Sequence, residues 1–428
     1  MKRAWLYIGV GIKRWLAVVV LGVLVSGFGL AFILNVDVLG RLERWLRTLL
    51  NPAGVWNPAY SLGIGGGLLA LGLFLAAFGL SRAARALVAA VWTGSGEALA
   101  NRLYDQHHLQ KGPKVVAIGG GTGLSTLLRG LKAYTSNITA IVTVADDGGS
   151  SGRLREELGI LPPGDIRNTL VALADTEPLM EELFQYRFQR GEGLQGHTFG
   201  NLFLASLTEV TGDFELAIRE SSRVLAVRGR VLPATLDSVR LQATFTDGTM
   251  AQGESRITAQ GKQIAKLELL PEGVRPIPEA LEAIAEADLI VIGPGSLFTS
   301  LMPHFLIPDM VEAIRAAKAP KVFVCNVMTQ PGETDGFTAS RHLQVLYDQV
   351  GPGLVDVCIV NGQPFPEDVL RRYEAEGAVP VAVDREAIEA LGVRPVVRAL
   401  LDENHMARHH PDRLAMAVLE QLVRPWTL

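Results

Sequence analysis

The chain has 428 residues, of which 48% are hydrophobic and 20% are charged. This composition excludes an intrinsically disordered protein, because disordered chains have few apolar residues and a high net charge. The formal net charge of −4 provides no broad basic surface, so no nucleic-acid partner is expected. The two cysteines, Cys325 and Cys358, are too few for a disulfide framework or a cysteine-ligated zinc site, and both lie in apolar, strand-like runs.

Two long uncharged segments lie near the N-terminus. Residues 15–34 read WLAVVVLGVLVSGFGLAFIL, and residues 62–81 begin with the run LGIGGGLLALGLFLAAFGL. About 20 apolar residues in a helix cross the hydrocarbon core of a bilayer, so both segments are long enough to span it. A signal peptide is disfavoured because a second span follows. A buried soluble hairpin is the other alternative. Residues 1–92 are therefore predicted to be a membrane anchor with two transmembrane helices.

Basic residues near the two spans predict their orientation. The basic residues that flank the pair of spans are Lys2, Arg3, Lys13, Arg14, Arg82 and Arg85. Since such residues are enriched on the cytoplasmic side, both termini are expected in the cytoplasm, in a multi-pass protein of the cell membrane. Gly63 and Gly67 form a GxxxG motif, which allows close contact between the two spans or, in a homo-oligomer, between two chains.

Residues 93–113 are expected to form a linker, and residues 114–428 one α/β domain. From Lys114 onward, Val- and Ile-rich runs such as VVAIGG, ITAIVTVADD, LIVIGPGS, KVFVCNVMT, VDVCIVNG and VPVAVD alternate with helical stretches. Continuous apolar strands separated by helices indicate a mostly parallel sheet that is covered on both faces. Alternating residues on both sides of Asp247-Gly248 predict a hairpin, which is a small antiparallel insertion in this domain.

Two glycine-rich loops follow predicted strands, at the end where open α/β sheets bind ligands. The run GGGTGLS supplies the candidates Gly120, Gly121, Thr122 and Gly123, and the run GPGSLFTS supplies Gly293, Gly295 and Ser296. Glycine lets a backbone approach phosphate, and a following helix start offers free N–H groups. The first loop is neither a G-x-G-x-x-G nor a Walker A motif. The alternative is that the glycines only form a tight turn. The presence of two such loops in one sheet favours a ligand with a diphosphate, or two ligands that meet there.

Two adjacent carboxylates, Asp146 and Asp147, end the second strand, in a run that also holds Ser150 and Arg153. Like charges repel, so this pair does not serve stability. It suits a ribose hydroxyl, a Mg²⁺ ion or general-base catalysis, and Arg153 suits a phosphate. In an extended strand end the two side chains should point to opposite faces, so only one faces a ligand. An acidic surface turn is the alternative.

Three further loops carry candidate binding residues. In LPPGDIRN, Asp165 suits helix capping as well as catalysis, whereas Asn168 is less easily explained by capping. In GHTFGN, His197 and Asn201 are four residues apart and are expected to share a helix face, with structural and functional roles both open. The run NVMTQPGET, which again follows a strand, supplies Asn326 and Thr329.

Several long runs together resemble a known family. The runs GGGTGLSTLLRGLK, ITAIVTVADDGGSSGRLR, LPPGDIRN, LFQYRF, GHTFGNL, DLIVIGPGSLFTS and NVMTQPGET resemble the YvcK-like gluconeogenesis factors, which are related to the CofD-like 2-phospho-L-lactate transferases. The resemblance implies a doubly wound, Rossmann-related α/β fold that binds a nucleotide diphosphate or a UDP-sugar. It further implies a regulatory protein that binds UDP-N-acetylglucosamine and supports cell-wall synthesis, cell shape and growth on gluconeogenic carbon, with cell-wall regulatory proteins as candidate partners.

The resemblance also points to two residues near the C-terminus. By this resemblance, Tyr373 in RRYEAEGAVPV and Arg408 in MARHHPDRLA match positions that contact a sugar nucleotide. The Tyr373 ring would stack on uracil, and the Arg408 guanidinium would bind the diphosphate. One alternative is a transferase that uses a nucleotide-diphosphate-linked donor, with Asp146, Asp147 or Asp165 as Mg²⁺ ligand or catalytic base. Another is an NAD-dependent oxidoreductase, which the absent G-x-G-x-x-G disfavours. The residues leave open whether a reaction is catalysed.

Overall fold

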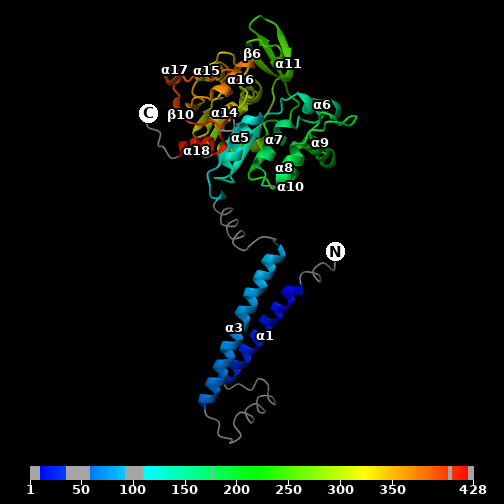
Figure 1. Cartoon of the computed structure of the whole chain (residues 1–428), viewed down its shortest axis with the longest axis vertical. Coiled ribbons are helices and arrows are strands. Elements are labelled where there is room, and N and C mark those ends of the chain that lie inside the picture. The colour runs from blue at the N-terminus through cyan, green and yellow to red at the C-terminus, as the bar shows by residue number, and fades with distance from the viewer. Residues whose placement is uncertain (1–9, 35–57, 92–108, 176–177, 403–406, 423–428) are drawn as a thin grey trace. The chain divides into compact units, whose positions relative to one another are not determined.

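The structure is a computed structural model that describes residues 10–34, 58–91, 109–175, 178–402 and 407–422. It divides into two compact units, Met1–Asp105 and Gln106–Leu428. Figure 1 shows both units. Most of the predicted linker, and the basic residues Lys2 and Arg3, lie outside the described residues. The predicted boundaries 1–92, 93–113 and 114–428 stay a prediction.

The first unit contains two long apolar helices, α1 (Val10–Leu34) and α3 (Pro58–Val91), and each is long and apolar enough to cross a membrane. They pack closely through glycines. A Cβ atom at Gly22 would lie 2.5 Å from the main-chain nitrogen of Ala76, and one at Gly72 would lie 2.4 Å from that of Ser26. Only hydrogen fits at these positions, so the two backbones approach each other at the contact.

The glycines in this contact are not those of the predicted GxxxG motif. A Cβ atom at Gly63 or Gly67 would meet nothing within 4 Å, whereas Gly65, Gly72 and Gly79 all contact α1. These three lie seven residues apart, and a seven-residue spacing returns to one helix face after two turns. The expected contact between the two helices is present, but the motif assigned to it is wrong.

The second unit is built on a seven-stranded sheet with the order β10-β9-β8-β7-β1-β2-β3, and every pairing in it is parallel. The strands are β1 (Val115–Gly119), β2 (Ile138–Val142), β3 (Arg230–Pro233), β7 (Leu289–Ile292), β8 (Lys321–Val324), β9 (Val357–Asn361) and β10 (Arg394–Arg398). All residues of β1, β2 and β7 are buried, which explains why these strands read as continuous apolar runs.

Helices cover both faces of this sheet, so the α/β, doubly wound fold class is confirmed (Figure 1). The helices are α5 (Gly121–Leu131), α6 (Gly149–Leu158), α7 (Gly164–Leu173), α8 (Pro178–Gln185), α9 (Phe199–Thr211), α10 (Phe214–Val224), α12 (Pro278–Ala285), η2 (Leu297–Leu301), α13 (Met302–Phe305), α14 (Pro308–Ala316), α15 (Ala339–Val350), α16 (Glu367–Ala375), α17 (Arg385–Ala390), α18 (Pro411–Leu419) and η3 (Glu420–Leu422). The strand order reverses between β1 and β7, which places a ligand crevice at their carboxyl ends.

A second sheet of three strands confirms the antiparallel insertion. Its order is β5-β4-β6, with β4 (Arg240–Phe245), β5 (Met250–Gln252) and β6 (Ile264–Leu270), and the short helix α11 (Glu254–Ala259) lies between β5 and β6. The β4–β5 turn contains Gly248 at φ +81°, a conformation that favours glycine. In the main sheet, the run VPVAVD forms isolated bridges at Pro380 and Ala382 instead of a strand, and the edge strand is β10.

Candidate functional site

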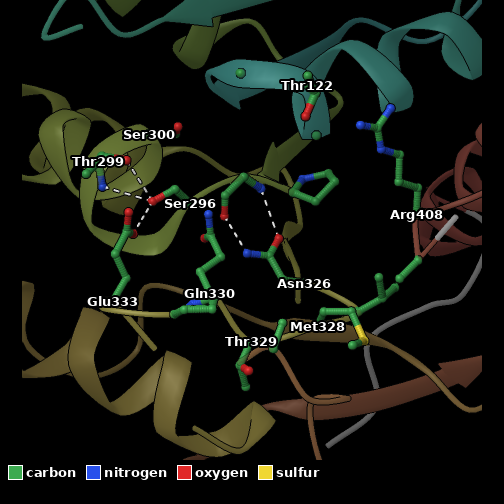
Figure 2. Close-up of a pocket in the computed structure, with 18 of the residues that line it drawn as sticks. Thr122, Ser296, Thr299, Ser300, Asn326, Met328, Thr329, Gln330, Glu333 and Arg408 are labelled. Atoms are coloured by element: carbon green, nitrogen blue, oxygen red, sulfur yellow. Dashed lines mark hydrogen bonds between the residues drawn. The ribbon is translucent and has the colours of Figure 1, made fainter. Parts of the chain in front are cut away.

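A cavity of about 610 Å³ opens where the main sheet reverses its strand order, and Figure 2 shows part of its lining. The lining includes ten of the residues that the sequence singles out, which come from the loops after β1, β7 and β8 and from the C-terminal region. These residues are Gly120, Gly121, Thr122, Gly123, Gly295, Ser296, Asn326, Thr329, Tyr373 and Arg408. The structure therefore brings the two glycine loops and the two C-terminal candidates to one place.

The two glycine loops contact each other directly. A Cβ atom at Gly123 would lie 2.5 Å from the carbonyl oxygen of Pro294, so a side chain there would push the loops apart. Gly121 begins α5 at φ +66°, which favours glycine. Gly293 turns the chain at φ +80° below the cavity and does not line it. Because helix starts leave N–H groups without helical partners, the starts of α5 and η2 offer donors at one cavity.

Asn326, which follows β8, binds the second glycine loop by two hydrogen bonds. Its side-chain oxygen accepts a hydrogen bond from the Gly295 N–H at 3.2 Å, and its amide donates to the Gly295 carbonyl at 2.8 Å (Figure 2). The main-chain N–H of Thr329 donates to the Val379 carbonyl at 2.8 Å, and Thr329 Oγ1 accepts from the Val379 N–H at 3.0 Å. Both side chains line the cavity, and their bonding shows that they also hold its loops in position.

An acidic wall, which we define as Glu254, Thr258, Ser296, Thr299 and Glu333, lines one side of the cavity. The Ser296 hydroxyl donates to Glu333, and Thr299 Oγ1 donates to Ser296 Oγ at 2.7 Å (Figure 2). Thr258 Oγ1 lies 3.4 Å from the other oxygen of Glu333, and Glu254 bonds the side chain of Thr299. This network joins α11 of the insertion to the glycine loop after β7.

Sequence reasoning did not choose Glu254 or Glu333 as candidates, although Glu333 lies in the run NVMTQPGET that supplies Asn326 and Thr329. Glu254 begins α11, within the insertion, and Glu333 lies in the loop after β8. Burial raises the pKa of both carboxyl groups, and the nearby carboxyl groups of Asp146 and Asp165 help to raise that of Glu254 to about 9. At neutral pH Glu254 is therefore protonated and can donate a hydrogen bond into the cavity.

The raised pKa of Glu254 predicts how stability depends on pH. Between the ordinary pKa of 4.5 and the folded-state value of about 9, the folded chain holds a proton that the unfolded chain releases. The free energy of unfolding therefore falls as pH rises through this window, by up to about 1.4 kcal/mol per pH unit from this group. We expect Glu254→Gln to remove this pH-dependent contribution to the free energy of unfolding. The variant should therefore become more stable relative to wild type as the pH is raised from 6 to 8. Calorimetric unfolding at both pH values checks this.

Glu376→Gln is the matched control for that measurement, because Glu376 lines the same cavity but is exposed. It should follow the pH dependence of the wild-type protein. If the free energy of unfolding changed with pH by the same amount in wild type and in Glu254→Gln, Glu254 would not be protonated at neutral pH as assigned.

The opposite side of the cavity is apolar. Val327, Met328, Ala378 and Ala407 line it and belong to a small hydrophobic cluster against which Tyr373 packs. The Tyr373 hydroxyl accepts a hydrogen bond from the Ala407 N–H at 3.3 Å, so the tyrosine also positions the segment that carries the next residue, Arg408. Figure 2 shows the Arg408 side chain extending toward the start of α5, where Thr122 lies. Arg408 is the only Arg or Lys among the described residues that line the cavity.

Five other candidates, Ser150, Arg153, Asn168, His197 and Asn201, form a polar cluster with Arg167 outside the cavity lining. His197 Nδ1 lies 3.0 Å from Ser150 Oγ, and the Asn201 amide donates to the same hydroxyl at 3.0 Å. Arg167 bonds Asn201 at 3.1 Å and Asn168 at 2.7 Å. Arg153 donates to the carbonyl of Gln195 at 2.9 Å, beside the loop that carries His197. The helix α9 begins only at Phe199, so His197 and Asn201 meet through Ser150 and not along one helix face.

The adjacent carboxylates take different partners, but they do not lie at the strand end that the sequence predicts, because β2 ends at Val142. Asp146 accepts a hydrogen bond from the Gly148 N–H at 2.8 Å, so it caps the turn, whereas Asp147 accepts from the Ser255 N–H at 2.9 Å in the insertion. Asp165 lies inside the first turn of α7 and does not cap it. Its carboxylate accepts from the Gly121 N–H, and burial, aided by the charge of Asp146, raises its pKa to about 7.

Asp165 therefore lies directly behind the first glycine loop. A Cβ atom at Gly120 would lie 2.4 Å from one of its carboxylate oxygens. Within the described residues, no group of three or more His, Cys, Asp or Glu side chains is arranged to hold a metal ion. Binding of Mg²⁺ by Asp146 or Asp147, and the ligand-contact roles of the candidate residues, stay predictions.

Comparisons with known proteins agree with these features. The family model of 2-phospho-L-lactate transferase CofD matches residues 115–401. The gluconeogenesis factors of Halalkalibacterium halodurans and Bacillus subtilis are 54% and 51% identical over 311 residues, which are 72% of this chain and 97% and 98% of those proteins. A homologue from Nostoc sp. is 49% identical over 420 residues, 97% of this chain and 91% of its own length.

A solved structure shows the same domain. The crystal structure of a protein from Bacillus halodurans matches with a TM-score of 0.70 at 54% identity, covering 72% of this chain and 100% of that one. On the identity of its relatives and the extent of the matched domain, the chain belongs to the gluconeogenesis factor family, whose α/β domain is of the CofD type.

Proposed function

We propose that this protein is a membrane-anchored, cytosol-facing regulatory protein that binds a UDP-sugar, with UDP-N-acetylglucosamine as its ligand. Through this ligand it supports cell-wall synthesis, cell shape and growth on gluconeogenic carbon, together with cell-wall regulatory proteins. The observation that carries the proposal is that one cavity combines three kinds of surface. One side is apolar, a second part has two helix starts and an arginine, and a third part has carboxyl and hydroxyl groups.

Each part of a nucleotide sugar has a chemically suitable wall in this cavity. A flat base suits the apolar side, where Tyr373 packs with Val327 and Met328. A diphosphate suits the helix starts and Arg408, because both attract negative charge. The hydroxyl and amide groups of a sugar suit the acidic wall, whose oxygens accept hydrogen bonds. This assignment places the sugar next to the insertion and the base next to the C-terminal segment.

Titration calorimetry on the full chain in lipid nanodiscs tests the proposal, with UDP-N-acetylglucosamine, UDP-glucose, GDP and NAD as separate ligands. We expect the UDP-sugars to bind and the unfolding temperature to rise with their concentration. Chromatography of the same mixtures should show intact UDP-N-acetylglucosamine after incubation. Binding of GDP or NAD without binding of any UDP-sugar would contradict the proposal.

Asp165 favours a second candidate function, transfer of a phospho-hydroxyacid group from a nucleotide-diphosphate-linked donor. Its carboxyl group lies behind the phosphate-type loop, and a pKa of about 7 suits a group that takes up or releases a proton at neutral pH. Asp165→Asn separates the two functions, since it keeps the shape of the side chain. A regulatory protein should then lose cellular function only as far as it loses ligand affinity. Complete loss of cellular function at wild-type affinity would favour the transferase.

The anchor in this proposal rests on α1 and α3. Among the side chains that the structure describes in the two helices, most of those outside the mutual contact are exposed to the surroundings. Lipid suits such an apolar surface, because a helix satisfies its own main-chain hydrogen bonds. We expect a cysteine introduced within residues 35–54 to react with a membrane-impermeant reagent added outside the cell. A cysteine added at position 428 should react only after lysis, because the basic flanks favour cytoplasmic ends. The native Cys325 and Cys358 are buried and should give no background. External labelling at position 428 would refute this topology.

A further inference from the structure

We infer that His304 is a positioning residue for the diphosphate, because it holds the first peptide of the first glycine loop so that the Gly120 N–H serves as a donor at the cavity. The inference rests on the proposed function, since it requires a diphosphate in the cavity. It gives a role to a residue outside the cavity lining, which neither the family membership nor the cavity shape assigns.

His304 links the two glycine loops from behind the cavity. It lies in α13, which follows the second glycine loop and η2, and its side chain is completely buried. Its Nε2 atom lies 3.1 Å from the carbonyl oxygen of Gly119, the last residue of β1. A bond between residues 185 positions apart therefore joins the start of the first loop to the helix that follows the second.

The partner of Nε2 defines the protonation of the ring. A carbonyl oxygen only accepts hydrogen bonds, so Nε2 carries the hydrogen and donates it to Gly119. The Nδ1 atom is buried and has no partner among the described residues, and burial lowers the pKa of His304 to about 4. The ring is therefore neutral at physiological pH, with its single N–H directed at the Gly119 carbonyl.

Two hydrogen bonds fix the direction of the peptide between Gly119 and Gly120. Besides the His304 ring, the N–H of Thr143, which follows β2, donates to the Gly119 carbonyl at 3.1 Å. This peptide is trans, and in a trans peptide the C=O and the N–H point in opposite directions. Since the carbonyl is bonded on the side of β2, the Gly120 N–H is directed to the other side of β1, where β7 lies.

The Gly120 N–H is left over where the pairing of β1 with β7 stops. The preceding carbonyl, that of Ile118, still accepts from the Gly293 N–H at 2.9 Å, but the chain then turns at Gly293, with φ +80°. In the described part of the chain no oxygen accepts from the Gly120 N–H, and Gly120 lines the cavity. Main-chain N–H groups are rarely unpaired, so this one points to an acceptor that a ligand supplies, such as a phosphate oxygen.

Titration calorimetry of the full chain in nanodiscs with UDP-N-acetylglucosamine tests the inference. His304→Leu removes the donor and leaves an apolar side chain in the buried position. It should weaken binding by about tenfold, because the ligand must then order a peptide that the wild-type protein holds in place. Its free energy of unfolding should stay close to that of wild type, because the substitution also removes the unpartnered Nδ1.

His304→Gln separates positioning from stability. The amide nitrogen of glutamine can take the place of Nε2 and donate to Gly119, so the affinity should stay within about threefold of wild type. Its amide oxygen would be buried without a partner, so this variant should be less stable than His304→Leu. The more stable variant is thus expected to bind more weakly, which a residue that acts only through stability would not produce.

His342→Leu is the matched control. His342 is also buried, its Nδ1 bonds the Thr338 carbonyl at 2.8 Å, and its Nε2 has no partner among the described residues. Its bond lies within α15 and its cap and holds neither glycine loop. The variant should therefore bind UDP-N-acetylglucosamine with wild-type affinity.

The outcomes separate this inference from the proposed function. A His304→Leu protein that binds as tightly as wild type, or affinities that follow stability across the two variants, would overturn the role of His304 alone. If His304→Leu fails to fold, His304→Asn replaces it, because its shorter amide does not reach Gly119 and should bind about tenfold more weakly than His304→Gln. Wild-type protein that binds no UDP-sugar would overturn the proposed function and this inference with it.

Discussion

Arg408→Ala is expected to weaken UDP-sugar binding by about tenfold to a hundredfold, because charge-assisted hydrogen bonds contribute about 1.5–3 kcal/mol. Arg408 is the only arginine or lysine among the described residues of the cavity lining, so no neighbouring cation there replaces it. Its side chain extends toward the start of α5, where the diphosphate is proposed to bind (Figure 2). Calorimetry gives the change in Kd.

Arg408→Lys should give an intermediate loss, since lysine keeps the charge but lacks the planar, paired donors of the guanidinium group. Arg385→Ala is the control, because Arg385 is exposed at the start of α17 and does not line the cavity. It should bind with wild-type affinity. An Arg408→Ala protein that binds the UDP-sugar as tightly as wild type would refute the diphosphate assignment.

Gly123→Ala is expected to disrupt the site by separating its two glycine loops. The added methyl group would lie 2.5 Å from the Pro294 carbonyl oxygen and 3.0 Å from the Gly295 nitrogen, and both are main-chain atoms. We expect a loss of about 1–3 kcal/mol in the free energy of unfolding from this overpacking. Ligand affinity should fall by about a hundredfold, because the donors at the two helix starts lose their relative geometry.

Gly212→Ala controls for the loss of stability. Gly212 ends α9 at φ +72°, and an added Cβ atom there would meet nothing within 4 Å. The strained backbone should cost about 1–2 kcal/mol, while the affinity stays at the wild-type value. Measuring the free energy of unfolding and the ligand affinity of both variants therefore separates a general loss of stability from a local change in the contact between the glycine loops. Equal affinities for the two variants would contradict the proposed role of the loop contact.

Local patterns in the sequence predict most of the main sheet and ten of the residues that line the cavity. Buried parallel strands need continuous apolar residues, and loops that approach phosphate need glycine, so both leave signals within a few residues. The motif around Gly121 and the one around Gly295 were therefore recognisable, and the structure places them side by side. The strand alternation predicted for Asp146 and Asp147 does not apply to them, because β2 ends four residues earlier, at Val142.

The acidic wall has such a signal only in part, because Ser296 and Glu333 lie in the runs GPGSLFTS and NVMTQPGET, whereas Glu254 lies in no motif. Glu254 reaches the cavity because the insertion packs on the segments after β7 and β8, and no spacing in the chain encodes that approach. Asp165 looks like a helix cap in sequence, but its carboxylate turns toward Gly121, which only the tertiary structure reveals.

The central position of β1 affects how the chain is made. Its neighbours are β2, which follows soon after, and β7, where Asp288 bonds Lys114 across a separation of 174 residues. At about 5–20 residues per second, a ribosome needs roughly ten to thirty-five seconds to extend the chain that far. During this interval a nascent chain presents one unpaired edge of an apolar strand. We therefore expect newly made protein to bind chaperones until β7 pairs with β1.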